Sequence, residues 1–81
     1  MTRLPRNLGG TELVNRLRRL GYRIVRQTGS HIRLSCNLPQ PHHVTIPAHD
    51  PLRIGTLAVI LADIARHHNM TRDELVNRLE T

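Results

Sequence analysis

The sequence predicts an α+β domain in which a three-stranded antiparallel sheet is covered on one face by helices. Apolar residues recur at helical spacing over residues 11–20 and 54–66, which predicts two amphipathic helices. Between them lie three short runs rich in β-branched residues, separated by segments that contain glycine or proline, and these predict strands. A further short helix is expected near the C-terminus. Because the apolar face of each element must be buried against another, we expect both main helices on one face of the sheet. The opposite face is then open.

The first helix is expected over residues 11–20, after a lead-in over residues 1–9 that shows no periodicity and is predicted to be flexible. Its apolar residues share one face: Leu13, Val14, Leu17 and Leu20. Glu12 lies near the N-terminus, where the helix dipole favours an acidic side chain. Gly21 supplies the residue after the helix that can adopt a positive φ.

The next two strands are predicted over residues 22–27 and 31–36, joined by a three-residue turn, Thr28–Ser30. With this turn, Gln27 opposes His31 and Ile24 opposes Leu34, and Gly29 is available for a bulge conformation. Paired residues share a face. The face toward the helices then carries Tyr22, Ile24, Ile32, Leu34 and Cys36. The open face carries Arg23, Val25, Gln27, His31, Arg33 and Ser35. Only Val25 and Arg26 are misplaced by this register.

The third strand is predicted over residues 42–46, with Val44 and Ile46 directed inward and His43 and Thr45 on the face of His31. The second main helix follows over residues 54–66. Thr71, followed three residues later by Glu74, forms a capping box and predicts the C-terminal helix over residues 71–80.

The charge of the chain is concentrated in its middle. All twelve basic residues are arginines, the formal net charge is +6, and no Asp or Glu occurs between residues 13 and 49. Six arginines and four histidines lie in that interval. A local positive field of this kind indicates a polyanionic partner such as RNA or DNA. A solvated basic surface, or one that meets an acidic protein, is the alternative.

Other features of the composition exclude several classes of protein. With Cys36 as its one cysteine, the chain cannot form an intramolecular disulfide. No apolar run approaches the length of a membrane span, and the N-terminus lacks the apolar segment of a secretory signal. We therefore expect a cytoplasmic protein. The histidines at positions 42, 43, 49, 67 and 68 do not predict a metal site, because adjacent histidines project in different directions and no thiols or carboxylates cluster with them.

Several motifs together are similar to a known family. They are Leu20-Gly21-Tyr22 at the end of the first helix, the run Val25-Arg26-Gln27-Thr28-Gly29-Ser30-His31, the strand Val44-Thr45-Ile46-Pro47, His49, and the helix start Ile54-Gly55-Thr56-Leu57 with Ile60-Leu61. In this set the chain resembles the HicA family, small toxins of bacterial toxin–antitoxin pairs, over residues 10–66. We therefore expect residues 1–81 to form a single HicA-like domain with residues 10–66 as its core.

The resemblance implies a fold like that of a double-stranded-RNA-binding domain, cleavage of mRNA, and a HicB-like antitoxin as partner. The catalytic histidine of the family falls on His31. The chain departs from many members at Ile32 and Leu34, where they carry a second histidine and an aromatic residue. It also extends past residue 66, where short members end. Whether the chain forms a homodimer or a hetero-oligomer with the antitoxin is left open by these residues.

The candidate site residues follow from the residues and the resemblance together. His31 is expected to act as the general base that takes the 2′-hydroxyl proton of RNA, without a metal or other cofactor. Arg26 and Arg33 are candidates for holding the scissile phosphate, or for general attraction of RNA. Arg23, Ser30 and His43 are further candidates for RNA contacts, and His43 is also a candidate general acid. Gly29 is expected to serve the turn.

Two other functions fit the same residues. A non-catalytic RNA-binding module would use the same sheet and arginines without cleavage. An interaction protein would direct the basic face at an acidic protein and would have no affinity for RNA at physiological salt.

Overall fold

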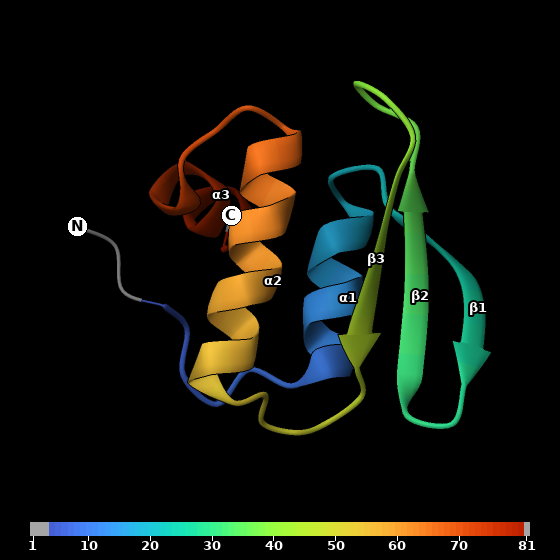
Figure 1. The fold of residues 1–81 in the computed structure, drawn as a ribbon. Coiled ribbons are helices and arrows are strands. Elements are labelled where there is room, and N and C mark those ends of the chain that lie inside the picture. The colour runs from blue at the N-terminus through green and yellow to red at the C-terminus, as the bar shows by residue number, and fades with distance from the viewer. Residues whose placement is uncertain (1–3, 81) are drawn as a thin grey trace.

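The computed structural model describes residues 4–80 and contains the elements in the predicted order (Figure 1). They are α1 (Gly10–Arg18), β1 (Arg23–Thr28), β2 (His31–Cys36), β3 (His42–Pro47), α2 (Ile54–His67) and α3 (Arg72–Leu79). The three strands form one antiparallel sheet in the order β1-β2-β3. The predicted α+β fold, which resembles a double-stranded-RNA-binding domain, is confirmed.

The helices lie on one side of the sheet, and the opposite face of the sheet is uncovered (Figure 1). The largest fully buried side chains come from every element except β1: Leu13, Val14, Leu17, Leu34, Ile46, Leu57, Leu61, Ile64, Leu75 and Val76. All six residues of β1 are exposed. Ile24 opposes Leu34 as predicted, yet 46% of it is exposed, because β1 extends past the helix layer. The core therefore lies between the helices and the strands β2 and β3.

The hairpin between β1 and β2 differs from the predicted one. Thr28 opposes His31, so the turn contains two residues, Gly29 and Ser30, where a three-residue turn was expected. Gly29 has a φ of 55°, and Ser30 is not among the residues with positive φ, which is the pattern of a type II′ turn with glycine first. This turn matches the twist of the strands that flank it.

The extra residue of the hairpin lies in the strand, at a β-bulge between Ile24 and Arg26. From Arg26 to Thr28 the register is shifted by one residue relative to the prediction, and side chains there exchange faces. Arg26 opposes Arg33 on the open face, and Gln27 opposes Ile32 on the other face. The prediction was wrong for both residues, because it placed the irregularity in the turn.

The N-terminal segment packs on the core as far as it is described. Leu8 is buried, and its carbonyl accepts a hydrogen bond of 2.8 Å from the backbone N–H of Leu52. Leu4 packs against the same core. Leu4 and Leu8 of the predicted flexible lead-in therefore contribute to the core, because isolated apolar residues without periodicity still fill space there. Residues 1–3 lie outside the described part of the chain.

The C-terminal helix α3 begins at the predicted capping box. The N–H of Glu74 donates to Oγ1 of Thr71 at 3.1 Å, and the N–H of Thr71 donates to Oε1 of Glu74 at 2.9 Å. Leu75 and Val76 are fully buried, so α3 belongs to the core. Within residues 4–80, no helix combines the length and the apolar character that crossing a membrane requires.

Candidate functional site

The candidate site is the open face of the sheet, which presents three rows of side chains that run across the strands. Residues that oppose each other in neighbouring strands point to the same face. The register therefore defines the open face by nine residues in three rows: Thr28–His31–Pro47, Arg26–Arg33–Thr45 and Arg23–Ser35–His43. Successive rows are about 7 Å apart, because residues on one face of a strand alternate.

His31 lies in the row nearest the turn. It is the first residue of β2 and is exposed, between Thr28 of β1 and Pro47 of β3. The turn beside it is held to β3, because the N–H of Ala48 donates to the carbonyl of Ser30 at 2.6 Å. Gly29 permits the turn, with no other atom near the position that a Cβ would occupy. The imidazole is thus open to a ligand on a well-supported backbone.

Arg33 and Arg26 form the middle row, next to the row of His31. The two residues oppose each other in β2 and β1, and both are exposed. Cross-strand neighbours lie about 5 Å apart at Cβ, so the two guanidinium groups can reach the same anion. The structure therefore adds Arg26 to His31 and Arg33 on the open face, from which the predicted register had separated it.

His43 and Arg23 lie in the third row, on either side of Ser35. Ser35 is four residues along β2 from His31, which is about 14 Å. His43 thus lies two rows from His31, and this spacing of the backbones favours water over His43 as the general acid that partners His31. It remains available for a contact with a longer ligand.

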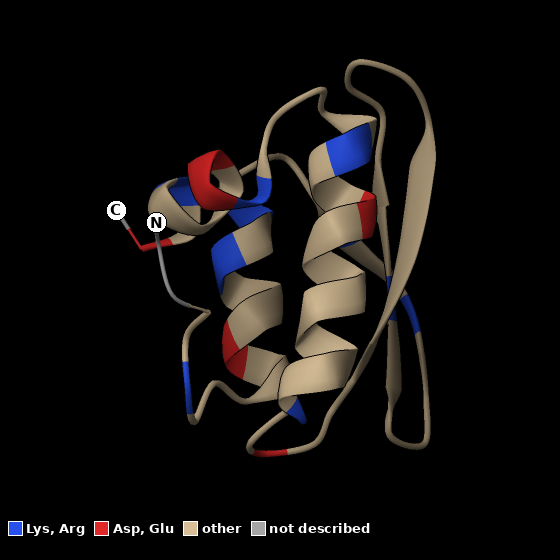
Figure 2. Cartoon of the chain, turned by 60° about the vertical axis from the view of Figure 1, so that its left-hand side comes forward, with Lys and Arg blue, Asp and Glu red and all other residues tan. Residues whose placement is uncertain are grey.

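The open face carries positive charge without acidic neighbours. None of the three strands contains Asp or Glu, and Figure 2 shows the acidic positions of the described chain on helices and loops. The arginines on this face therefore have no carboxylate there to pair with. Their field is directed at solvent, where an anion with several charges would be attracted.

A second polar cluster lies at the other end of the sheet, around the buried Tyr22. The tyrosine hydroxyl is 2.9 Å from Nδ1 of His42 and 3.0 Å from Nε2 of His68. Nε2 of His42 lies 3.4 Å from Oδ2 of Asp63. His67 stacks on His42, with ring centroids 4.0 Å apart, and its Nε2 is buried without a hydrogen-bond partner in the described residues.

The proton positions in this cluster follow from its geometry. A carboxylate only accepts, so Asp63 favours a proton on Nε2 of His42 and leaves Nδ1 as an acceptor. The hydroxyl of Tyr22 then donates to His42 and accepts from Nε2–H of His68. Burial raises the pKa of Tyr22, which keeps the hydroxyl protonated. These two hydrogen bonds connect Tyr22 to His42 at the start of β3 and to His68 at the end of α2.

Replacement of His68 by glutamine is expected to reduce the pH dependence of stability. Burial, followed by the neighbouring His67, His42 and Arg78, lowers the pKa of His68 from 6.5. The unfolded chain therefore binds the proton more tightly, and the free energy of unfolding falls as the pH drops below about 6.5. In His68→Gln the amide still donates to Tyr22 but does not titrate. Urea unfolding at pH 7.5 and 5.5 measures the difference.

His49→Gln is the control for this experiment, since His49 is exposed in the loop after β3 and lies outside the cluster. It should retain the pH dependence of the parent. An unchanged pH dependence in His68→Gln would show that the protonation of His68 does not limit stability.

Sequence reasoning missed the cluster around Tyr22. His42, His67 and His68 were considered only as possible metal ligands, and Tyr22 was considered only as a core residue. Across residues 4–80, no group of three or more His, Cys, Asp or Glu side chains is arranged to hold a metal ion. The signal that could have revealed the cluster is the histidine pair at the end of α2, together with a single aromatic residue whose hydroxyl needs a partner when buried.

The chain was compared with known proteins. The family model described as the HicA toxin of bacterial toxin–antitoxin matches residues 10–65, which run from the first residue of α1 almost to the end of α2. No curated protein and no solved structure gives a significant match. The matched segment includes all three strands and the whole open face.

Proposed function

Because the chain belongs to the HicA family of bacterial toxins, we propose that it is an endoribonuclease that cuts mRNA with His31 as its catalytic base. The observation that supports this most is the position of His31. It is an exposed imidazole on an open face, one row from the pair Arg26 and Arg33, with no carboxylate on the strands.

The proposed reaction is an attack within the RNA chain. The imidazole of His31 takes the proton of a 2′-hydroxyl, and the 2′ oxygen bonds to the adjacent phosphorus. The bond from phosphorus to the 5′ oxygen breaks, and that oxygen takes a proton from water, since His43 lies two rows from His31. The products are a 2′,3′-cyclic phosphate and a 5′-hydroxyl. In this scheme His31 supplies the base, and the guanidinium groups of Arg26 and Arg33 supply the positive charge.

Arg26 and Arg33 are proposed to bind the phosphate that reacts. Negative charge accumulates on the phosphoryl oxygens during the attack, and guanidinium groups fixed beside them stabilise it. Two arginines from opposing strands can hold the phosphate from two directions, with the imidazole at its side. Ser30, in the turn beside His31, is proposed as a further contact for the same phosphate.

The three rows also suggest how a longer RNA lies. Rows about 7 Å apart along β2 suit successive phosphates of an extended single strand. His31 lies in the row at one end of the open face, and Arg23 and His43 lie in the row at the other end. These two residues would therefore contact phosphates on one side of the cut only. The open face carries no Phe, Tyr or Trp side chain for base stacking, so recognition is expected to depend on the backbone and not on sequence.

Arg33→Gln is expected to lower RNA affinity about tenfold, because a charge-assisted hydrogen bond to phosphate contributes roughly 1.5 kcal/mol. The slope of log Kd against log salt should also fall by about 0.7, the value for one phosphate on a single strand. Filter binding of an unstructured RNA by the protein with His31→Ala, which leaves the RNA uncut, measures both quantities.

Arg18→Gln is the matched control, because it removes the same charge from α1, in the helix layer. It should change affinity and slope much less. Equal effects of Arg33→Gln and Arg18→Gln would contradict binding at the open face and would indicate attraction by net charge alone.

The family is that of toxins paired with an antitoxin, so an antitoxin is the expected protein partner. We propose that it is HicB-like, that it blocks the open face, and that the toxin acts on mRNA in the cytoplasm. An acidic antitoxin would complement the net charge of +6.

A further inference from the structure

The two edges of the sheet differ in how well they are protected against pairing with another strand. An unprotected edge presents backbone N–H and C=O groups to any available strand. The β1 edge has a bulge and two arginines, which are both known ways to block pairing. The β3 edge has neither, since β3 is in regular register with β2 along its six residues and contains no arginine.

The hydrogen-bond pattern identifies which groups of β3 are free. The N–H of Ala48 donates to the carbonyl of Ser30, in register with the β2–β3 ladder. Backbone N–H and C=O groups alternate in direction along a strand. Those of Ile46 and Val44 therefore also point at β2, and those of His43 and Thr45 point away from it. No other backbone hydrogen bond of the described chain engages His43 or Thr45. Pro47, the next outward position, has no N–H and ends the row of donors.

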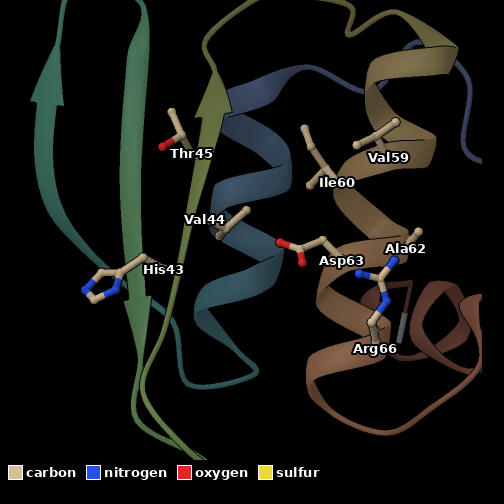
Figure 3. A pocket seen from close by; sticks show the side chains of 8 residues that line it. All are labelled: His43, Val44, Thr45, Val59, Ile60, Ala62, Asp63 and Arg66. Atoms are coloured by element: carbon tan, nitrogen blue, oxygen red, sulfur yellow. The ribbon is translucent and has the colours of Figure 1, made fainter.

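A groove runs beside this edge, between β3 and α2 (Figure 3). Its apolar lining includes Val44, Ile60 and Val59, and 71% of Val59 is exposed. Its volume of about 530 Å³ is open to solvent along the strand. Figure 3 shows Arg66 at the end of the groove near Asp63, and Val59 farther along α2. Asp63 also faces His42, and Arg66 makes no ion pair with the described residues.

We propose that the β3 edge is where the antitoxin docks, by adding a strand of alternating apolar and acidic residues to the sheet. The main chain of this strand pairs with the outward groups of His43 and Thr45. Its apolar side chains cover Val59 and Ile60 in the groove. Its acidic side chains emerge on the other side of the sheet, beside Thr45 and the row of Arg33, where the field is positive.

Charge selects this partner over a second copy of the chain. A second copy pairing through β3 would bring a strand with no carboxylate, from a segment that has none between residues 13 and 49. It would also place two basic open faces on one continuous sheet. An acidic strand at the same edge instead neutralises the face, and it positions the rest of the antitoxin next to His31.

The inference rests on the proposed antitoxin partner, and binding of that purified antitoxin tests it. In the ¹⁵N-labelled chain, the amide protons of His43 and Thr45 should exchange with solvent about tenfold more slowly in the complex, or slower still. Val59→Arg, which places a cation in the groove, should weaken antitoxin binding roughly 30-fold or more. Exchange rates that do not change at these two amides would overturn the proposal.

Val25→Arg is the matched control, because Val25 is an exposed valine at the opposite edge. It should bind the antitoxin within about twofold of the parent. Antitoxin binding that Val59→Arg leaves unchanged would overturn the proposal. So would a dimer of the chain alone that slows exchange at the same amides, because the occupant would then be a second copy. RNA cleavage should be unchanged in Val59→Arg, so the docking edge and the proposed ribonuclease activity are tested separately.

Discussion

His31→Ala is expected to reduce RNA cleavage by about 100- to 10,000-fold, the usual contribution of a positioned acid–base group. The loss should appear in the rate of the bound complex, because the arginines that bind RNA are unchanged. His31 is exposed at the start of β2, so its replacement removes no core contact. Single-turnover cleavage of a labelled RNA by an excess of purified protein measures the rate, and circular dichroism checks the fold.

His43→Ala is the control for this experiment, because it removes a histidine from the same face at about 14 Å from His31. It should weaken binding and leave the single-turnover rate at saturation close to that of the parent. If folded His31→Ala cuts RNA at the parent rate, His31 is not the base. If the parent protein binds RNA and leaves it intact, the chain is a binding module of the same fold.

Gly10→Ala is expected to destabilise the protein by about 3 kcal/mol. A Cβ at Gly10 would collide with the backbone carbonyl of Pro47 and press on Ala48, which are main-chain atoms that cannot rotate away. The N–H of Gly10 also donates to the carbonyl of His49 at 2.8 Å, which fixes the start of α1 against the end of β3. Urea unfolding of parent and variant measures the change.

Gly55→Ala provides the opposite case at the start of α2. Nothing lies near the position of its Cβ, so alanine should stabilise the helix by up to about 1 kcal/mol. Equal effects of the two substitutions would show that the close approach at Gly10 is relaxed in solution.

The helices could be predicted because their signals are local. The 3.6-residue period identified α1 and α2, and the capping box at Thr71 identified the start of α3. The strands were also recognisable from their β-branched residues. Their faces were also predicted correctly except next to the turn, where one bulge exchanges the faces of Arg26 and Gln27. A bulge at Val25 and one at Gly29 give nearly the same alternation of apolar residues, so the sequence does not distinguish them.

Other features depend on contacts between distant parts of the chain. The partners of Tyr22 come from the start of β3 and the end of α2, so no sequence window contains them. The exposure of β1 and the free edge of β3 depend on where the helices sit over the sheet. Arg26 illustrates the consequence, since charge alone made it a candidate and only the register places it opposite Arg33.

The chemistry of the RNA ends tests the central claim, that His31 activates a 2′-hydroxyl, most directly. Purified protein in EDTA should cut a labelled RNA to give 2′,3′-cyclic phosphate and 5′-hydroxyl ends. A single 2′-deoxy nucleotide at the cut site should block the reaction there. Products with 5′-phosphate and 3′-hydroxyl ends, or equal cleavage of the 2′-deoxy substrate, would contradict the account.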